Sequence, residues 1–192
     1  MRATRKALYA LLAIGLTGTV AGLGSYAAFS TTTANTGNSV SSGTVALADS
    51  DSGAAMFSVT GMNPTTPAIE KCVKVDYSGA LDAGVKLYTT SSIGSLGQYL
   101  NLAIRPGTGN PTFPSCTGFT PDAADLFSGT LASFAGTYSS YASGLADNPG
   151  SATKWVTNDS VIYRFTLTLQ NNTAAEGLST GTFAITWEAR NQ

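Results

Sequence analysis

The sequence contains no histidine among its 192 residues. Ser-His-Asp and Cys-His catalytic arrangements both need an imidazole as the general base, so the chain cannot build either of them. The chain also lacks the His-Glu-x-x-His helix of zinc proteases and the usual histidine-containing zinc site. We therefore expect no enzymatic activity, no catalytic residue, no bound metal and no cofactor.

Charged residues are scarce as well, at 11% of the chain. The basic residues beyond residue 28 are few and scattered, so they provide no electrostatic footprint for nucleic acid. Asp49 and Asp51, in the run Asp-Ser-Asp-Ser-Gly from 49 to 53, faintly resemble the start of a calcium loop. Because the distal bidentate glutamate of such a loop is missing, we interpret this run as a solvated turn.

The N-terminus has the organisation of an export signal. Three basic residues within the first six precede an apolar stretch from 7 to 20, and small residues then lead to Ala28. This order of charge, apolar core and small residues is typical of a secretory signal peptide. We predict a signal helix over residues 1–28, cleavage between Ala28 and Phe29, and a secreted product. No later apolar run approaches the ~20 residues needed to cross a bilayer, so contact with the membrane is expected only through the signal peptide before cleavage.

The segment after the predicted cleavage site is polar and has neither a clear apolar period nor a helix cap. We predict that it is a free extended segment ahead of the strand character that begins near Val45 and Leu47. Its residues are Phe29, Ser30, Thr31, Thr32, Thr33, Ala34, Asn35, Thr36, Gly37 and Asn38.

The two ends of the chain resemble a known family. The stretches 24–30, 35–38 and 42–47 (Ser-Gly-Thr-Val-Ala-Leu) are similar to the start of the TasA/camelysin family, although Thr31 stands where many members have Asp. Residues 59–64 resemble a family turn that ends in Pro-Gly-Asp, with two threonines here in place of Gly-Asp. The block from 155 to 190 resembles the paired C-terminal strands of the family, whereas the middle of the chain matches poorly.

This resemblance implies an extracellular fibre subunit of a biofilm matrix, exported and processed by a signal peptidase of the SipW type. A free N-terminal segment can lend a strand to the sheet of a neighbouring subunit, and main-chain hydrogen bonds then provide the affinity. Donor and acceptor are different surfaces of one chain, so the contact is head-to-tail and propagates into a homopolymer. We assign residues 29–38 as the donor strand, with Phe29 as its anchor. An accessory or anchoring subunit is a further partner that the resemblance leaves open.

Three alternatives compete with this hypothesis. The N-terminal segment could be disordered or fold back onto its own sheet, and the protein could be a monomeric secreted or cell-surface binding module that uses its Pro/Gly-rich loops. The camelysin name carries a metalloendopeptidase assignment, but the missing histidines argue against a zinc protease of that kind.

Alternation of apolar and polar residues predicts a fold made almost entirely of strands. The best patterns cover 69–77, 161–169 and 183–190, and weaker ones cover 55–60, 85–87 and 100–104. We interpret the last two segments of the chain, 161–169 and 183–190, as an antiparallel pair. The segment 122–134 predicts a short helical insertion, and 105–116 a loop rich in Pro and Gly.

About eight strands in this arrangement indicate an all-β, antiparallel β-sandwich over residues 39–192, which the family resemblance narrows to a jelly roll. Cys72 lies on the face of its strand that points away from the main core, toward the loop that contains Cys116. In an oxidising compartment these two cysteines are expected to form a disulfide, and two separate thiols are the alternative.

Overall fold

Nine β-strands and one short α-helix make up most of the regular structure that the computed structural model describes, which covers residues 41–192. Ser42–Gln192 forms one compact unit. The predicted signal peptide and the predicted donor strand, 1–28 and 29–38, lie outside the described residues. The strands are β1 (Leu47–Asp49), β2 (Ile69–Tyr77), β3 (Ala83–Tyr88), β4 (Leu100–Gly109), β5 (Phe119–Pro121), β6 (Phe127–Thr130), β7 (Leu145–Asp147), β8 (Ser160–Leu169) and β9 (Thr186–Asn191).

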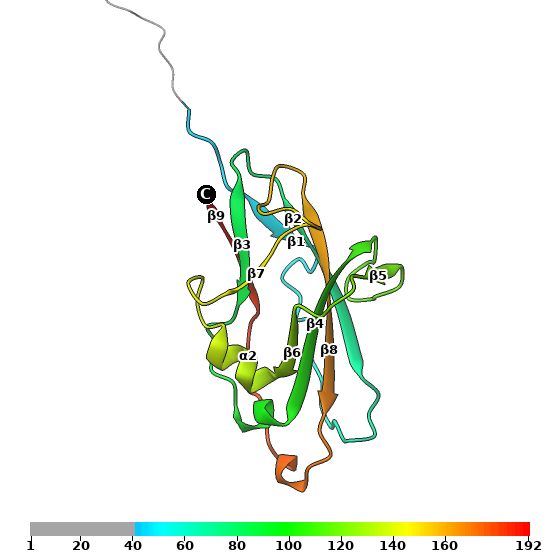
Figure 1. Ribbon diagram of the computed structural model, residues 1–192. Helices are drawn as coiled ribbons and strands as arrows, with labels where there is room; N and C mark the ends of the chain where they lie inside the picture. Colours follow the sequence, from blue (N-terminus) through cyan, green and yellow to red (C-terminus); the bar gives the residue numbers. More distant parts are fainter. Residues whose placement is uncertain (1–40) are drawn as a thin grey trace, which may run out of the picture. The chain divides into compact units, whose positions relative to one another are not determined.

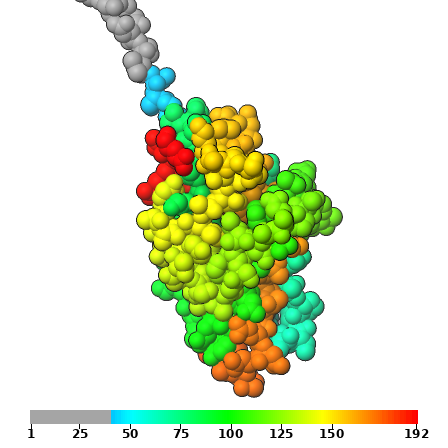
Figure 2. Space-filling model, in the orientation of Figure 1, coloured from blue at the N-terminus to red at the C-terminus, as the bar shows by residue number. Residues whose placement is uncertain are grey.

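The strands form two antiparallel sheets, so the prediction of an all-β antiparallel fold is confirmed (Figure 1). The larger sheet has the order β1-β2-β8-β4-β5, with β6 also paired to β4, and the smaller sheet has the order β7-β3-β9. The helices are α2 (Leu131–Thr137) and the 3-10 turns η1 (Ser95–Gln98) and η2 (Thr173–Ala175). Figure 2 shows α2 and the segment leading to β7, in yellow-green and yellow, covering much of the face turned to the viewer. Within residues 41–192, no helix is long and apolar enough to cross a membrane.

Both sheets contribute to one hydrophobic core. In β2 the predicted alternation is confirmed, because Val73, Val75 and Tyr77 are buried while Glu70 and Lys74 face outward. The other strands add residues of the same kind, which are Ala83, Val85 and Leu87 from β3, Leu100, Leu102 and Ile104 from β4, and Val161, Tyr163, Phe165 and Leu167 from β8. Burial of these apolar side chains is the main force that holds the sheets together, at about 25 cal/mol for each Å² removed from water.

Two local predictions are wrong because residues predicted to be helix or loop take part in the strand pairing of β4. The predicted helix over 122–134 begins later, since 127–130 forms β6 against β4 and Thr130 then caps α2. The Thr130 hydroxyl accepts a hydrogen bond from the Ser133 N–H at 3.1 Å, which satisfies a backbone donor of the first turn. The predicted loop 105–116 also keeps strand structure as far as Gly109, because β8 and β5 pair with it on opposite sides.

Two further predictions about the strands are wrong. The segment 55–60 is irregular rather than a strand. β8 and β9 do not form a pair, because β8 has both of its edges occupied by β2 and β4 within the larger sheet, whereas β9 pairs with β3 in the smaller sheet. The alternation in each segment indicates a strand, but it contains no information about which strand lies beside it.

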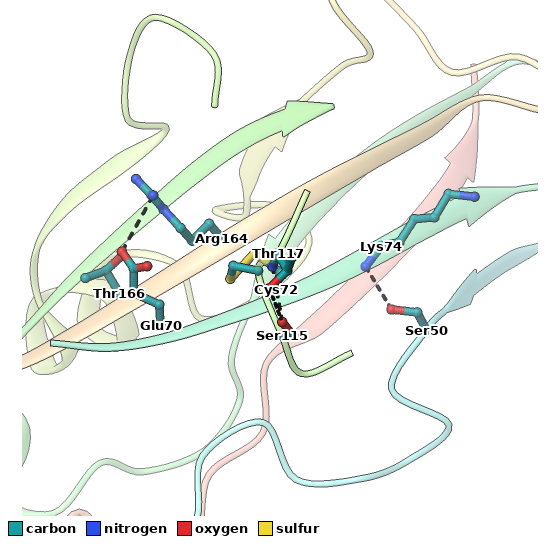
Figure 3. Close-up of a disulfide and its surroundings, with 9 residues drawn as sticks. Ser50, Glu70, Cys72, Lys74, Ser115, Thr117, Arg164 and Thr166 are labelled. Atoms are coloured by element: carbon teal, nitrogen blue, oxygen red, sulfur yellow. Dashed lines mark hydrogen bonds and ion pairs between the residues drawn. A yellow bond between two sulfur atoms is a disulfide. The ribbon is translucent and has the colours of Figure 1, made fainter. Parts of the chain in front are cut away.

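The predicted disulfide between Cys72 and Cys116 is present, and the Cα atoms of the two residues are 5.1 Å apart (Figure 3). Cys72 lies on the outer face of β2, as predicted, and is buried there by the loop that carries Cys116. The same loop lies against the edge of β2, because the carbonyl of Pro114 accepts a hydrogen bond from the Cys72 N–H at 3.2 Å. The disulfide therefore holds a cover over part of a sheet edge.

We predict that the double variant C72A/C116A folds but has a free energy of unfolding lower by about 2–4 kcal/mol, since the bond closes a loop across a separation of 44 residues. Urea unfolding monitored by circular dichroism measures this. An unchanged urea midpoint would contradict the stabilising role of the bond.

Asp147, the last residue of β7, is partly buried and lies beside the fully buried Trp155. The indole N–H of the fully buried Trp155 donates to the backbone carbonyl of Asp147 at 2.7 Å. Burial raises the pKa of the Asp147 carboxyl above its ordinary value, and the Tyr163 hydroxyl offsets part of this effect. Burial, followed by the charge of Asp147, raises the pKa of Tyr163 well above its usual range.

A raised pKa for Asp147 means that ionising this carboxyl opposes folding. Its contribution to stability is therefore most favourable below its unfolded-state pKa and declines as the pH rises through the folded-state pKa. Relative to the parent, Asp147→Asn should be more stable at pH 7 than at about pH 3.5, because the amide cannot ionise. Urea unfolding at several pH values measures the difference, and a difference that does not change with pH would contradict the assignment.

Candidate strand-binding seam

β1 and β9 are edge strands of the larger and the smaller sheet, and residues of both line one small hollow. On either side of β1, the Ser50 N–H donates to the Lys74 carbonyl of β2 at 2.9 Å, and the Ala46 carbonyl accepts from the N–H of Ser78, just after β2, at 3.0 Å. Alternate residues of an antiparallel strand direct their backbone groups to opposite sides, so Leu47 and Asp49 direct theirs away from β2. The edge of the larger sheet therefore presents backbone donors and acceptors on the side away from β2.

The same reasoning applies to β9. The Gln192 N–H donates to the Asp82 carbonyl at 3.1 Å, so the even-numbered residues of β9 bond to β3. The odd-numbered residues, including Trp187 and Ala189, direct their backbone groups outward. Among the described residues no strand pairs with this side of β9.

A small hollow with a volume of about 220 Å³ lies between these two edges. Its lining residues are Leu47, Ala48 and Asp49 of β1, Val75 of β2, and Ile185, Thr186 and Trp187 at the start of β9. The ring of Trp187 packs against Tyr163 and Phe165, with ring centroids 5.7 and 5.9 Å away. Its indole N–H is buried and has no hydrogen-bond partner within residues 41–192. A buried donor without a partner is costly, so this N–H lowers the stability of the described fold.

A second, larger hollow with a volume of about 950 Å³ is lined by the segments that adjoin β1 and β9 in the sequence. One wall is the irregular segment 55–64, which comes after β1, and the other is the segment 171–183, which comes before β9. Leucine side chains of η1, β4 and β8 also line it, namely Leu96, Leu100, Leu167 and Leu169. We call the two hollows together the seam. The two walls run in opposite chain directions. The chain passes from the small hollow to the large one along 47–64, and from the large hollow to the small one along 171–187.

Both walls of the large hollow contain strand-like sequence without strand pairing. No backbone hydrogen bond joins residues 55–62 to any other described residue. In the opposite wall, the N–H of Ala184 bonds only to the side chain of Ser91, at 3.0 Å, and β9 begins at Thr186 although the alternation starts at 183. Met56, Phe57 and Phe183 still pack against the core, so these side chains are buried although their backbone groups have no partner strand.

The remaining candidate motifs take structural roles. The Asp51 carboxylate accepts a hydrogen bond from the Gly53 N–H at 2.6 Å, so the run 49–53 forms the predicted turn. Asn63 similarly accepts from the Thr65 N–H at 3.0 Å within the 59–66 turn. Throughout the described part of the chain, no group of three or more Asp, Glu, Cys or His side chains is placed to hold a metal ion.

Sequence reasoning assigned the donor segment but did not place an acceptor. The failed strand predictions at 55–60 and 183–185 were the available signal, because both fall on the walls of the seam. No family model and no curated protein matches this sequence.

We predict that the two tryptophans respond differently to replacement by phenylalanine. Trp187→Phe keeps a ring against Tyr163 and removes a donor that lacks a partner, so unfolding free energy should change by about 1 kcal/mol or less. Trp155→Phe loses a satisfied hydrogen bond at a fully buried position and should cost about 2–4 kcal/mol. Urea titration of both variants measures this, and equal costs would contradict the assignment of the unpartnered N–H.

Proposed function

We propose that this chain is a secreted structural protein that assembles into extracellular fibres of a biofilm matrix after its signal peptide is cleaved between Ala28 and Phe29. Assembly is by head-to-tail donor-strand complementation, in which residues 29–38 of one copy enter the seam of the next. The observation that carries the proposal is the seam itself, where the outer sides of β1 and β9 have no partner strand within residues 41–192 and residues 55–62 make no backbone hydrogen bond beside a hollow of about 950 Å³.

A β-strand is the ligand whose chemistry suits this site. The edges of β1 and β9 offer alternate N–H and carbonyl groups, which an extended backbone satisfies in a repeating pattern that side-chain ligands cannot reproduce. An inserted strand also supplies backbone partners to residues 55–62, which have none within residues 41–192. We further propose that the completed sandwich is the jelly roll that the family resemblance implies.

The length of the donor suits the seam. Ten residues of extended chain span roughly 33 Å at about 3.3 Å per residue, which is more than the length of β9. Many of the ten residues are threonine, serine or asparagine, whose side chains tolerate the partly wet environment between two sheet edges. Partners in this proposal are further copies of the chain, a SipW-type signal peptidase for processing, and an accessory or anchoring subunit where the fibre needs one.

A monomeric secreted or cell-surface binding module is the second candidate function. The volume of the large hollow, about 950 Å³, falls within the range of small-molecule and peptide sites, and its leucine floor is apolar. In this alternative the hollow is a ligand pocket and the processed protein remains a monomer at every concentration.

We predict that deleting residues 29–38 from the processed chain leaves a folded monomer, because the core is complete without them, whereas the processed parent forms high-mass species as its concentration rises. Size-exclusion chromatography with light scattering, followed by electron microscopy, measures both. A matched control replaces the ten residues with an equally long Gly/Ser segment and should also remain monomeric.

Fibres formed by the deleted chain would contradict the donor role of 29–38. A parent that stays monomeric at all concentrations would contradict assembly and favour the binding module. A synthetic peptide of residues 29–38 should raise the melting temperature of the deleted chain, since a ligand that binds only the folded state stabilises it.

A further inference from the structure

The large hollow contains one charged side chain among its described lining residues, and this is Glu176. It comes directly after η2, on the wall that leads to β9. No Lys or Arg of residues 41–192 lies within ion-pair distance of its carboxylate. Nearby, Leu100, Leu167 and Leu169 present apolar surface to the same hollow. The large hollow therefore combines an apolar floor of leucine side chains with the single negative charge of Glu176.

The donor segment has the complementary combination at its first residue. Phe29 is the one large apolar side chain among residues 29–38. Cleavage after Ala28 converts the Phe29 amide nitrogen into a free α-amino group, which is mostly protonated at neutral pH. Before cleavage the same nitrogen is an uncharged peptide N–H, so the positive charge exists only in the processed chain.

We propose that the large hollow is a receptor for the free N-terminal phenylalanine of a second copy, with the ring on the leucine floor and the α-ammonium group paired with the Glu176 carboxylate. This inference rests on the proposed function, because it takes the donor segment as the occupant of the seam. It adds a chemical reason for the order of events, since an unprocessed chain offers neither the charge nor a chain end at this position.

The placement of Phe29 also fixes the direction of the donor. The large hollow adjoins Phe183 and the small hollow adjoins 185–187. A strand that begins in the large hollow and continues into the small one therefore runs in the same direction as 183–187. With equal rise per residue, Thr33 comes level with Trp187. The small threonine side chains that follow Phe29 suit the small hollow, whose volume is about 220 Å³.

The test compares the critical concentration for assembly of the processed chain, Phe29–Gln192, in four forms, measured by sedimentation. These are the parent, Glu176→Gln, the parent with an acetylated N-terminus, and Glu176→Gln with an acetylated N-terminus. Removing either charge should raise the critical concentration about two- to five-fold, as expected for an exposed ion pair. The doubly changed form should be no worse than either single one, because the two changes remove the same interaction.

Two further variants sharpen the result. Phe29→Ala should raise the critical concentration by about tenfold or more, because it removes the aromatic anchor. Glu70→Gln is the matched control, since it removes an acid from the outer face of the larger sheet, where Glu70 pairs with Arg164 at 3.6 Å. It should leave assembly unchanged. At about 1 M salt the effects of Glu176→Gln and acetylation should vanish while that of Phe29→Ala remains.

The outcomes separate this inference from the proposed function. If assembly requires residues 29–38 but is insensitive to both Glu176→Gln and acetylation, the ammonium receptor is overturned and donor-strand assembly stands. Additive effects of the two changes would also overturn the pairing. If the processed parent never assembles, both proposals fail.

Discussion

Hydrogen bonding of the backbone at strand edges is the constraint on which the rest of this structure depends. Every strand presents N–H and carbonyl groups on two sides, and inside the larger sheet β8 has both sides occupied by β2 and β4. At the edge of the fold each group needs another partner or water. Along β2 the cover comes from β1, from the Ser50 hydroxyl and from the carbonyl of Pro114. On the outer sides of β1 and β9, no strand of residues 41–192 supplies an equivalent cover.

Side-chain packing helps the seam to keep its shape where strand pairing is missing. Trp187 packs against Tyr163 and Phe165 of the larger sheet, so the start of β9 is held by these contacts as well as by its pairing with β3. In the opposite wall Met56, Phe57 and Met62 pack against the same core. Apolar burial is not directional, whereas sheet hydrogen bonds are, so a segment can be anchored by its side chains while its backbone remains available.

The disulfide covers part of the edge of β2, whereas the outer side of the neighbouring strand β1 has no such cover within residues 41–192. The Cys72–Cys116 bond ties a loop over the edge of β2 and makes that edge a poor template for a further strand. The outer sides of β1 and β9 have no such cover within residues 41–192, and in the proposed fibre they accept the donor strand. Because donor and acceptor are different surfaces of one chain, this contact propagates head to tail.

The sequence by itself determined the long strands, the inward and outward faces of β2 and β8, and the position of Cys72 on the outer face. These features follow from the two-residue period of a strand, which is local. It also predicts an export signal followed by a polar segment in residues 1–38, which lie outside the described residues. The pairing partners were beyond its reach, because alternation shows which face is buried but contains no information about the neighbouring strand.

Tertiary structure decided where the alternating segments could pair. β8 and β9 follow each other in sequence yet belong to different sheets, since β2 and β4 occupy both edges of β8. The segments 55–60 and 183–185 have strand-like sequence, but the fold of residues 41–192 gives their backbones no partner strand. Sequence therefore determined which segments are able to form strands. The three-dimensional packing decided which of these segments pair within the subunit, because a sheet hydrogen bond needs a second chain segment at the correct distance.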